Sequence, residues 1–420
     1  MQAKARKLTA LVAAAVATLS AGSALAATEA QKRAAIDNGL AWLASSQQGN
    51  GRWIYDNSYG DTAATSAALL AFLEEKPNWG ANAAAYQAVV DNGLNYVFSQ
   101  ATNYPFVQPA ADVNGNGLGV KFVPGGNEGR DTYVTGLVLP AIVATGTPNA
   151  IVANGSQAGR TYGAVVQDVV DYFAHGQNDA GYATGGWRYY ANSGDADNST
   201  AQWPPVGMLY AQSFGATVPG FVKTQLQTWI DYIQNPNGGS GYDSPGNLVN
   251  AAKTGGLLVE MAFAGYNGYA ADAVGSNEAL SYLNGTWQQM ANNTWDGNFN
   301  HPYAMWSIYK GLESTIGVDA DTSIINNLLS ANCGGNVDNP NHGCNWYEDY
   351  SEWLVNNQNG DGSWTGYSSW NNVLATPWYI NILAATEIPD NHAPEPGTLA
   401  LLAAGLFGIG PLARRRLTRS

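Results

Sequence analysis

Polar residues stand at the starts of several apolar segments of this chain, where they could take part in acid–base chemistry or bind a ligand. The pairs and runs are Asp61-Thr62, Asp131-Thr132, Asp197-Asn-Ser-Thr200, Asn300-His301 and Asn371-Asn372. A carboxyl group placed beside a substrate can donate or accept a proton. The alternative is helix N-capping, because Asp, Asn, Ser and Thr accept hydrogen bonds from the first backbone N–H groups of any helix.

Asp195 and Asp197 are the candidate catalytic acids, although no complete catalytic set of residues surrounds them in the sequence. A carboxylic acid protonates a substrate only where its surroundings retain its proton. Hydrolysis of a sugar chain would need two carboxylates about 5–10 Å apart across a cavity. The candidates for such a pair are Asp61, Asp131, Asp195 and Asp197. If Asp197 is a cap instead, an Asp197→Asn change should have little effect, since Asn caps almost as well.

A third candidate site is the segment Asp112-Val-Asn114-Gly-Asn116-Gly117. Its spacing matches the first half of a calcium loop of the EF-hand type. The twelfth position is Val123 instead of Glu, so Glu128 or Asp131 would have to replace the missing ligand. The alternative is a loop of Asx-turns, which these residues also favour. We therefore expect that no cofactor is required, with Ca²⁺ as the one candidate.

Repeated units must position these side chains. In the first unit, Gln47, Gly51 and Trp53 follow Trp42 by five, nine and eleven residues; in the last, Gln358, Gly362 and Trp364 follow Trp353 at the same spacing. Two further units keep the aromatic residue, the Gln and the Gly at the same spacing. These are Tyr172, Gln177 and Gly181, and Trp229, Gln234 and Gly238. Weaker copies begin at Tyr96 and Tyr282, which makes six units.

Each unit has two helical halves of different polarity. In residues 31–47 the apolar Ile36, Leu40 and Leu43 form one stripe, which is typical of a helix with one buried face. Residues 62–73 and 134–143 are apolar almost all round, so they must be surrounded by protein. The pattern predicts an all-α fold over residues 27–390, an (α/α)6 toroid with six inner and six outer helices. An open solenoid is the alternative, but it needs polar end caps that neither terminal unit has.

The spacing of Gln, Gly and Trp in these units resembles the QW motif of squalene cyclases and other terpenoid cyclases, a superfamily that includes the protein prenyltransferases. The resemblance covers roughly residues 30–386. It implies an α/α barrel with a cavity lined by the inner helices, and it places Asp197 where those cyclases carry the acid that protonates an alkene. Asn198 and Ser199 depart from the Asp and Thr of that motif. The chain also lacks the Asp-x-Cys pair of a prenyltransferase zinc site.

Large aromatic residues complete the expected cavity. Trp203, Trp306 and Trp370 fall in or beside the predicted inner helices. They are either core residues or a stacking surface for a sugar or an apolar chain. The predicted ligand-binding rim comprises Asp61, Asp131, Asp195, Asp197, His301, Trp203, Trp306 and Trp370.

The N-terminus has the features of a signal peptide. Basic residues Lys4, Arg6 and Lys7 precede an apolar run, and Ala24-Leu-Ala26 supplies small residues for signal peptidase. We expect residues 1–26 to be removed during export.

The C-terminus carries Pro394-Glu395-Pro396, an apolar run over 398–412 and the cluster Arg414-Arg-Arg416. Residues 391–420 resemble the PEP-CTERM sorting signal of Gram-negative bacteria, which exosortases recognise. The resemblance implies a transient inner-membrane anchor, with membrane contact through this helix only, followed by release to the cell surface or the medium. Whether the helix is cleaved stays open.

Composition excludes other classes. The net charge is −14, with 18 basic and 32 acidic residues, so the basic surface of a nucleic-acid-binding protein is missing. Cys333 and Cys344 are the only cysteines, and in an oxidising compartment so short a loop predicts a disulfide. A metal site with His342 is the alternative.

Three functions stay open at this point. The first is an exported surface protein whose toroid binds a ligand or partner without catalysis. The second is a carbohydrate-active enzyme that acts on exopolysaccharide, and the third is a terpenoid cyclase. Signal peptidase and an exosortase are the expected partners during export, with exopolysaccharide or an apolar molecule as the ligand. We favour the first function because no complete catalytic constellation is present.

Overall fold

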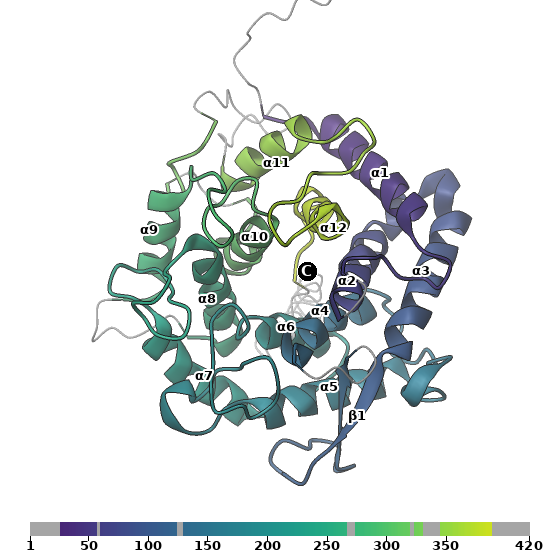
Figure 1. Ribbon diagram of the computed structural model, residues 1–420, viewed down its shortest axis with the longest axis vertical. Coiled ribbons are helices and arrows are strands. Elements are labelled where there is room, and N and C mark those ends of the chain that lie inside the picture. Colours follow the sequence, from purple (N-terminus) through teal and green to yellow (C-terminus); the bar gives the residue numbers. More distant parts are fainter. Residues whose placement is uncertain are drawn as a thin grey trace, which may run out of the picture.

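The computed structural model describes residues 26–56, 59–123, 129–266, 274–319, 323–330 and 345–388, and these residues are mainly helical (Figure 1). Two sets of six long helices alternate along this described part of the chain. The first set is α1 (Glu29–Ser46), α3 (Ala83–Ser99), α5 (Tyr162–Gly176), α7 (Gly220–Ile233), α9 (Ser276–Thr286) and α11 (Trp346–Asn356). The second set is α2 (Tyr59–Glu74), α4 (Asp131–Val143), α6 (Trp203–Ser213), α8 (Ala251–Ala264), α10 (Pro302–Ile316) and α12 (Asn372–Leu383). Short 3₁₀ turns lie at Lys76–Asn78, Gly80–Asn82, Gly155–Gln157 and Gly181–Ala183.

The second set forms a closed inner ring. Helix α2 packs against α4, and the contacts continue through α6, α8 and α10 to α12, which packs against α2 again. The first set surrounds this ring, as Figure 1 shows. The predicted (α/α)6 toroid is therefore confirmed, and the open solenoid is excluded.

Burial follows the polarity of each helix. Every residue of α4 except Tyr133 is buried, because inner helices have protein on all sides. In α7 the buried residues are Val222, Leu226, Trp229, Ile230 and Ile233, which form one stripe toward the inner ring. The hydrophobic pattern of the sequence thus sorts helices into the two layers.

The repeated Gln residues join neighbouring units. Each side-chain amide donates to the glycine carbonyl of its own turn and to a carbonyl in or beside the next outer helix. The second acceptors are Val89 O for Gln47 (2.8 Å), Val222 O for Gln177 (3.0 Å), Gly275 O for Gln234 (2.9 Å) and Ala35 O for Gln358 (2.7 Å). Because Gln358 belongs to the last unit and Ala35 to α1, this bond joins the two ends of the ring. A buried ion pair between Lys32 and Glu348 (3.0 Å) supports the same junction.

The glycine and tryptophan of the motif are structural as well. Gly362 has φ +91°, and a Cβ there would lie 2.4 Å from the Asn38 carbonyl oxygen of α1. The Trp364 indole donates to Leu354 O (2.8 Å), and Trp53 donates to Leu43 O (2.8 Å). These residues fasten each turn to the outer layer and do not face a ligand.

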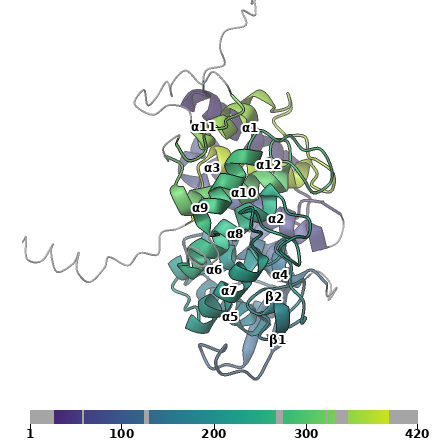
Figure 2. The ribbon, with the colours of Figure 1, turned by 90° about the vertical axis from the view of Figure 1, so that its left-hand side faces the viewer.

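Two local features differ from the sequence pattern. In the third unit the turn glycine is Gly185 instead of Gly181, since Gln177 donates to Gly185 O (2.9 Å) and Gly185 has φ +85°. In the second unit an antiparallel hairpin of β1 (Ala101–Pro105) and β2 (Leu118–Phe122) replaces the short turn. Figure 2 shows this hairpin at one end of the molecule.

The chain closes one end of the ring after α12. There Tyr309 Oη donates to Thr386 O (2.9 Å), and Lys310 Nζ donates to the same oxygen (2.5 Å). The Ile388 N–H donates to Glu313 (2.9 Å). All three partners lie in the C-terminal half of α10, so residues 386–388 lie at the end of the ring where the inner helices finish.

Candidate functional site

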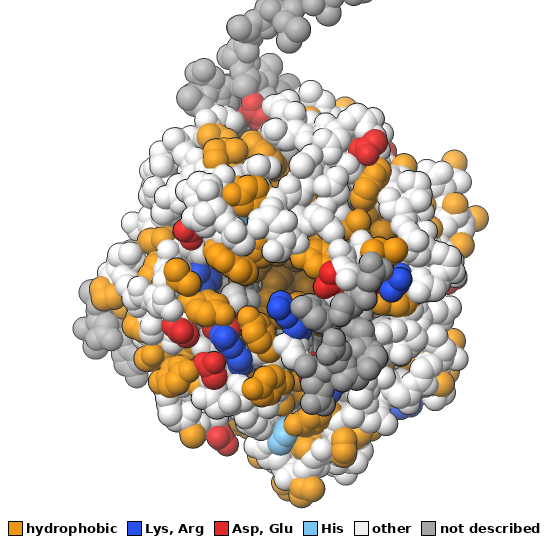
Figure 3. Space-filling view, in the orientation of Figure 1, with side chains coloured by type: hydrophobic (Ala, Val, Ile, Leu, Met, Phe, Trp, Pro, Cys, Tyr) orange, Lys and Arg blue, Asp and Glu red, His pale blue; other side chains and the backbone are white. Residues whose placement is uncertain are grey.

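A cavity of about 560 Å³ opens at the other end of the ring. All six inner helices contribute to its wall from their N-terminal halves. The lining residues on these helices are Gly60, Ala63, Tyr133, Leu137, Trp203, Lys253, Tyr303, Leu374 and Trp378. Figure 3 shows an apolar hollow at the centre of this face, with both basic and acidic side chains near its edge. The cavity size is that of a small-molecule site.

Nearly half of the lining residues are aromatic. The Trp203 indole stacks on Trp306 with ring centroids 5.2 Å apart and on Trp378 at 6.3 Å. The Tyr303 ring lies nearly parallel to Trp370 at 5.4 Å. Trp295 also lines the cavity and is 55% exposed. Such surfaces favour a ligand with a flat or hydrocarbon body.

Two cations line the cavity in its described part, Arg130 and Lys253. Lys253 is the third residue of α8 and is 4% exposed. Burial lowers the pKa of its ammonium group to about 8, while the charges of Asp296 and Asp197 oppose that change. The Arg130 guanidinium lies 5.4 Å from the Tyr189 ring centroid. At neutral pH the described part of the lining is therefore positively charged.

Acidic residues at the starts of inner helices lie behind this wall, each bound to a cation from the preceding turn. Asp61 pairs with Arg52 (3.0 Å), Asp131 with Lys121 (2.6 Å) and Asp197 with Arg188. All three aspartates are fully buried. The backbone N–H groups of Tyr55 and Asp56 also donate to Asp61. The N-capping alternative is wrong for Asp131 and Asp197, because the N-caps of α4 and α6 are Arg130 and Gln202 and neither has a side-chain capping hydrogen bond. The aspartates instead form ion pairs that the spacing did not reveal.

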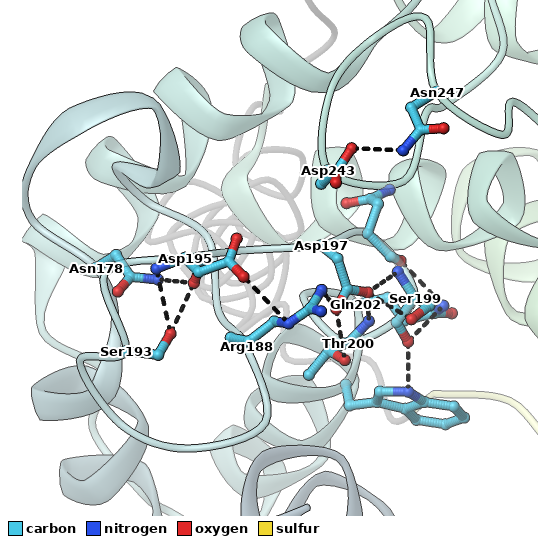
Figure 4. Close-up of polar contacts among 12 residues, drawn as sticks. Asn178, Arg188, Ser193, Asp195, Asp197, Ser199, Thr200, Gln202, Asp243 and Asn247 are labelled. Carbon is cyan, nitrogen blue, oxygen red and sulfur yellow. Dashed lines mark hydrogen bonds and ion pairs between the residues drawn. The ribbon is translucent and has the colours of Figure 1, made fainter.

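Asp197 has the densest set of partners (Figure 4). Its Oδ1 accepts hydrogen bonds from the N–H and hydroxyl of Ser199 and from the N–H of Thr200 (3.0 Å), and its Oδ2 contacts Arg188 and the Thr200 hydroxyl (3.3 Å). Burial raises the pKa of Asp197, and the bonds from Ser199 and the Arg188 charge oppose the rise. Each of these partners donates, so the carboxyl group acts as an acceptor, and Asp197 is not among the residues that line the cavity.

Asp195 lies on the opposite side of Arg188 (Figure 4). The Arg188 Nε to Asp195 Oδ2 distance is 3.5 Å, and the Tyr182 hydroxyl donates to the same carboxylate. The Asp195 side chain is 44% exposed, whereas that of Asp197 is fully buried. One guanidinium thus separates the two predicted acids.

His301 caps α10. The Ala304 N–H donates to its Nδ1 (3.3 Å), and its Nε2 lies 3.2 Å from Thr294 O. Burial lowers the pKa of His301 to about 4, so the ring is neutral at pH 7. Its ring centroid lies 4.7 Å from that of Trp370. His301 therefore supports the cavity wall from behind.

The predicted rim residues thus divide into two groups. Trp203 and Trp370 line the cavity. The residues that lie behind its wall or beside it are Asp61, Asp131, Asp195, Asp197, His301 and Trp306. Asp131 and Lys121 line a separate hollow of about 290 Å³ next to β2.

The loop with Asp112, Asn114 and Asn116 packs against α5. Asp112 accepts hydrogen bonds from the N–H groups of Asn116 (3.1 Å) and Gly117 (2.7 Å), four and five residues on. Asn114 and Asn116 accept from the N–H two residues on, at 3.1 and 2.8 Å, as in Asx-turns. Asn114 and Asn116 donate to Asp168 Oδ1 at 2.7 and 3.0 Å. Within the described ranges no three Asp, Glu, His or Cys side chains are grouped for one metal ion. Calcium binding stays a prediction.

Other predicted sites lie outside the described residues. These are the signal segment up to residue 25, the Cys333–Cys344 pair, the substitute ligand Glu128 and the motif Pro394-Glu395-Pro396. In the part that is described, no helix has the length and apolar character needed to span a membrane.

The cavity residues that sequence reasoning missed include the two cations Arg130 and Lys253 and the tyrosines Tyr189 and Tyr242. A signal for Lys253 was present, because it is a lysine near the start of a mainly apolar helix at 251–264. Arg130 precedes Asp131 directly. The two tyrosines lie in loops whose path the repeat pattern does not describe.

Comparisons with known proteins give two results. A model of the PEP-CTERM protein-sorting motif matches residues 392–417, which indicates an exported protein sorted by an exosortase system. The unliganded type II terpene cyclase MstE from Scytonema is structurally similar, with 13% identity and a TM-score of 0.48, over 85% of this chain and 98% of that one. A variant of that enzyme in complex with its product merosterolic acid A is 13% identical, with a TM-score of 0.47. The similarity covers 85% of this chain and 97% of that one. No curated protein matches the chain.

Proposed function

We propose that the exported toroid binds an amphipathic small molecule in its central cavity and does not cyclise or hydrolyse it. The observation that carries this proposal is the composition of the cavity wall. It combines stacked aromatic rings with Lys253 and Arg130, and its described residues include no Asp or Glu. A cyclase of the proton-donating type needs an acid in contact with the alkene, and a glycosidase needs two carboxylates across the site.

The buried aspartates also support binding over catalysis. Asp197 is committed to Arg188, Ser199 and Thr200, so a proton on either oxygen would displace one of these donors. Asp61 and Asp131 are committed to Arg52 and Lys121 in the same way.

A cavity-filling variant tests the proposal. Ala63 lines the cavity, so Ala63→Met should reduce the space available to a ligand. We expect calorimetry with 2-naphthalenemethanol to show binding to the wild-type protein and at least tenfold weaker binding to this variant. Ala84→Met on the exposed surface of α3 is the matched control and should bind as the wild type does. Equal binding by all three proteins would place the ligand elsewhere and reject the proposal.

A further inference from the structure

The cavity has a charge opposite in sign to that of the whole molecule. The chain has a net charge of −14. In the cavity, the described lining contains Arg130 and Lys253 and no carboxylate. Since the molecule as a whole repels anions, two cations directed to one apolar hollow point to a local function.

Lys253 is the more informative of the two cations. Its ammonium group has no hydrogen-bond or ion-pair partner among the described residues, although the residue is 4% exposed. The nearest acids are engaged elsewhere. Asp197 pairs with Arg188, and Asp296 accepts from Asn250 (3.2 Å) and from an Asn293 amide (2.9 Å). A buried ammonium without a partner is costly, so the cavity is the place where its three donors can be satisfied.

Helix direction adds to this positive potential. All six inner helices contribute to the cavity from their N-terminal halves. A helix N-terminus carries a partial positive charge of about half a unit, which favours anions nearby. The aspartates that could cancel this potential, at positions 61, 131 and 197, are already neutralised by their own cations.

We infer that the cavity takes an amphipathic organic acid, with its carboxylate on Lys253 and its apolar body against Trp203, Trp378 and Tyr303. This inference rests on the proposed function and names the ligand class of the same cavity. The three rings belong to α6, α12 and α10, so the body lies across the ring while the acid group lies at α8. Arg130 adds a second positive charge on the α4 side.

The test compares two probes of almost the same shape, 2-naphthoate and the uncharged 2-naphthalenemethanol. Both are titrated into the processed protein at pH 7, where the pKa of about 8 leaves Lys253 charged. A hydrogen bond to a charged group contributes about 1.5–3 kcal/mol, so naphthoate should bind at least about tenfold more tightly than the alcohol. Lys253→Met should remove this preference and leave alcohol binding within about twofold.

A matched variant and the two probes separate the outcomes. Lys223→Met changes another lysine of lowered pKa, on outer helix α7, and should keep the wild-type preference. If the wild type binds both probes equally, or if Lys253→Met retains the preference, the carboxylate assignment is wrong while the proposed binding function stands. If neither probe binds the folded wild-type protein, the proposed function fails as well.

Discussion

Replacing Asp197 by Asn tests whether this residue is a cap, an ion-pair partner or a catalytic acid. As a simple cap, Asn would serve almost equally well. In the structure, however, the carboxylate receives donors from Ser199 and Thr200 on one oxygen and from Arg188 on the other. The side-chain NH₂ of an asparagine at this position would face a hydrogen-bond donor whichever of the two oxygens it replaced. The variant therefore leaves Arg188 with the more distant and partly exposed Asp195 (3.5 Å) in place of its buried counter-charge.

The magnitude follows from the burial of the pair. Breaking a buried ion pair from one side costs about 3–5 kcal/mol. The Arg188 side chain is 20% exposed, so water recovers part of this cost, and we expect a loss of about 2–3 kcal/mol. An unfolding entropy of about 2.1 cal/mol/K per residue gives about 0.8 kcal/mol/K for roughly 360 residues. The Tm should therefore fall by about 3–4 °C.

The assay is thermal unfolding followed by circular dichroism, with Asp195→Asn as the matched control. Asp195 contacts the same Arg188 from a position that is 44% exposed, so its variant should melt within about 1 °C of the wild type. Adding Arg188→Met to Asp197→Asn should recover part of the loss, because the cation that has lost its buried partner is removed. An unchanged Tm for Asp197→Asn would refute the ion-pair reasoning. Loss of a turnover activity in the folded variant would show that the protein is an enzyme.

Three further predictions concern the scaffold, the cavity and the chain ends. Gly362→Ala should lower the Tm strongly, because its Cβ would meet a backbone oxygen of α1, whereas Gly360→Ala has open space and should be neutral; thermal melts of both decide this. Burial lowers the pKa of Lys253 to about 8, against about 10.4 in an unfolded chain. Its charge therefore opposes folding most below pH 8, and urea titrations should show the wild type gaining stability relative to Lys253→Met between about pH 8 and 10. Intact mass of the exported protein should lack residues 1–26, and loss of 391–420 as well would demonstrate cleavage of the tail.

The fold was predictable because two independent signals agreed. One-sided and all-round apolar segments alternate along the chain, and the Gln-Gly-Trp spacing repeats with them. The candidate site was less predictable. Acids at helix starts are visible in the sequence, but their partners are not. Arg52, Lys121 and Arg188 lie nine or ten residues before the aspartates they bind, so the pairing depends on the path of each turn. The three paired aspartates do not line the cavity, and its wall is formed by other residues, which include Arg130 and Lys253.

The bond from Gln358 to Ala35 also determines how the molecule can come apart. A linear array of repeats loses its terminal units first, since each of them has a single neighbour. In the closed ring the first and last units are neighbours, so releasing either one breaks two interfaces at once. We therefore infer that the protein unfolds as one cooperative body without frayed end repeats. Gln358 precedes residues 391–420, so a protein that has lost this tail keeps the bond from Gln358 to Ala35 that joins the first and last units. It should therefore resist proteolysis outside the cell as well as the full chain does.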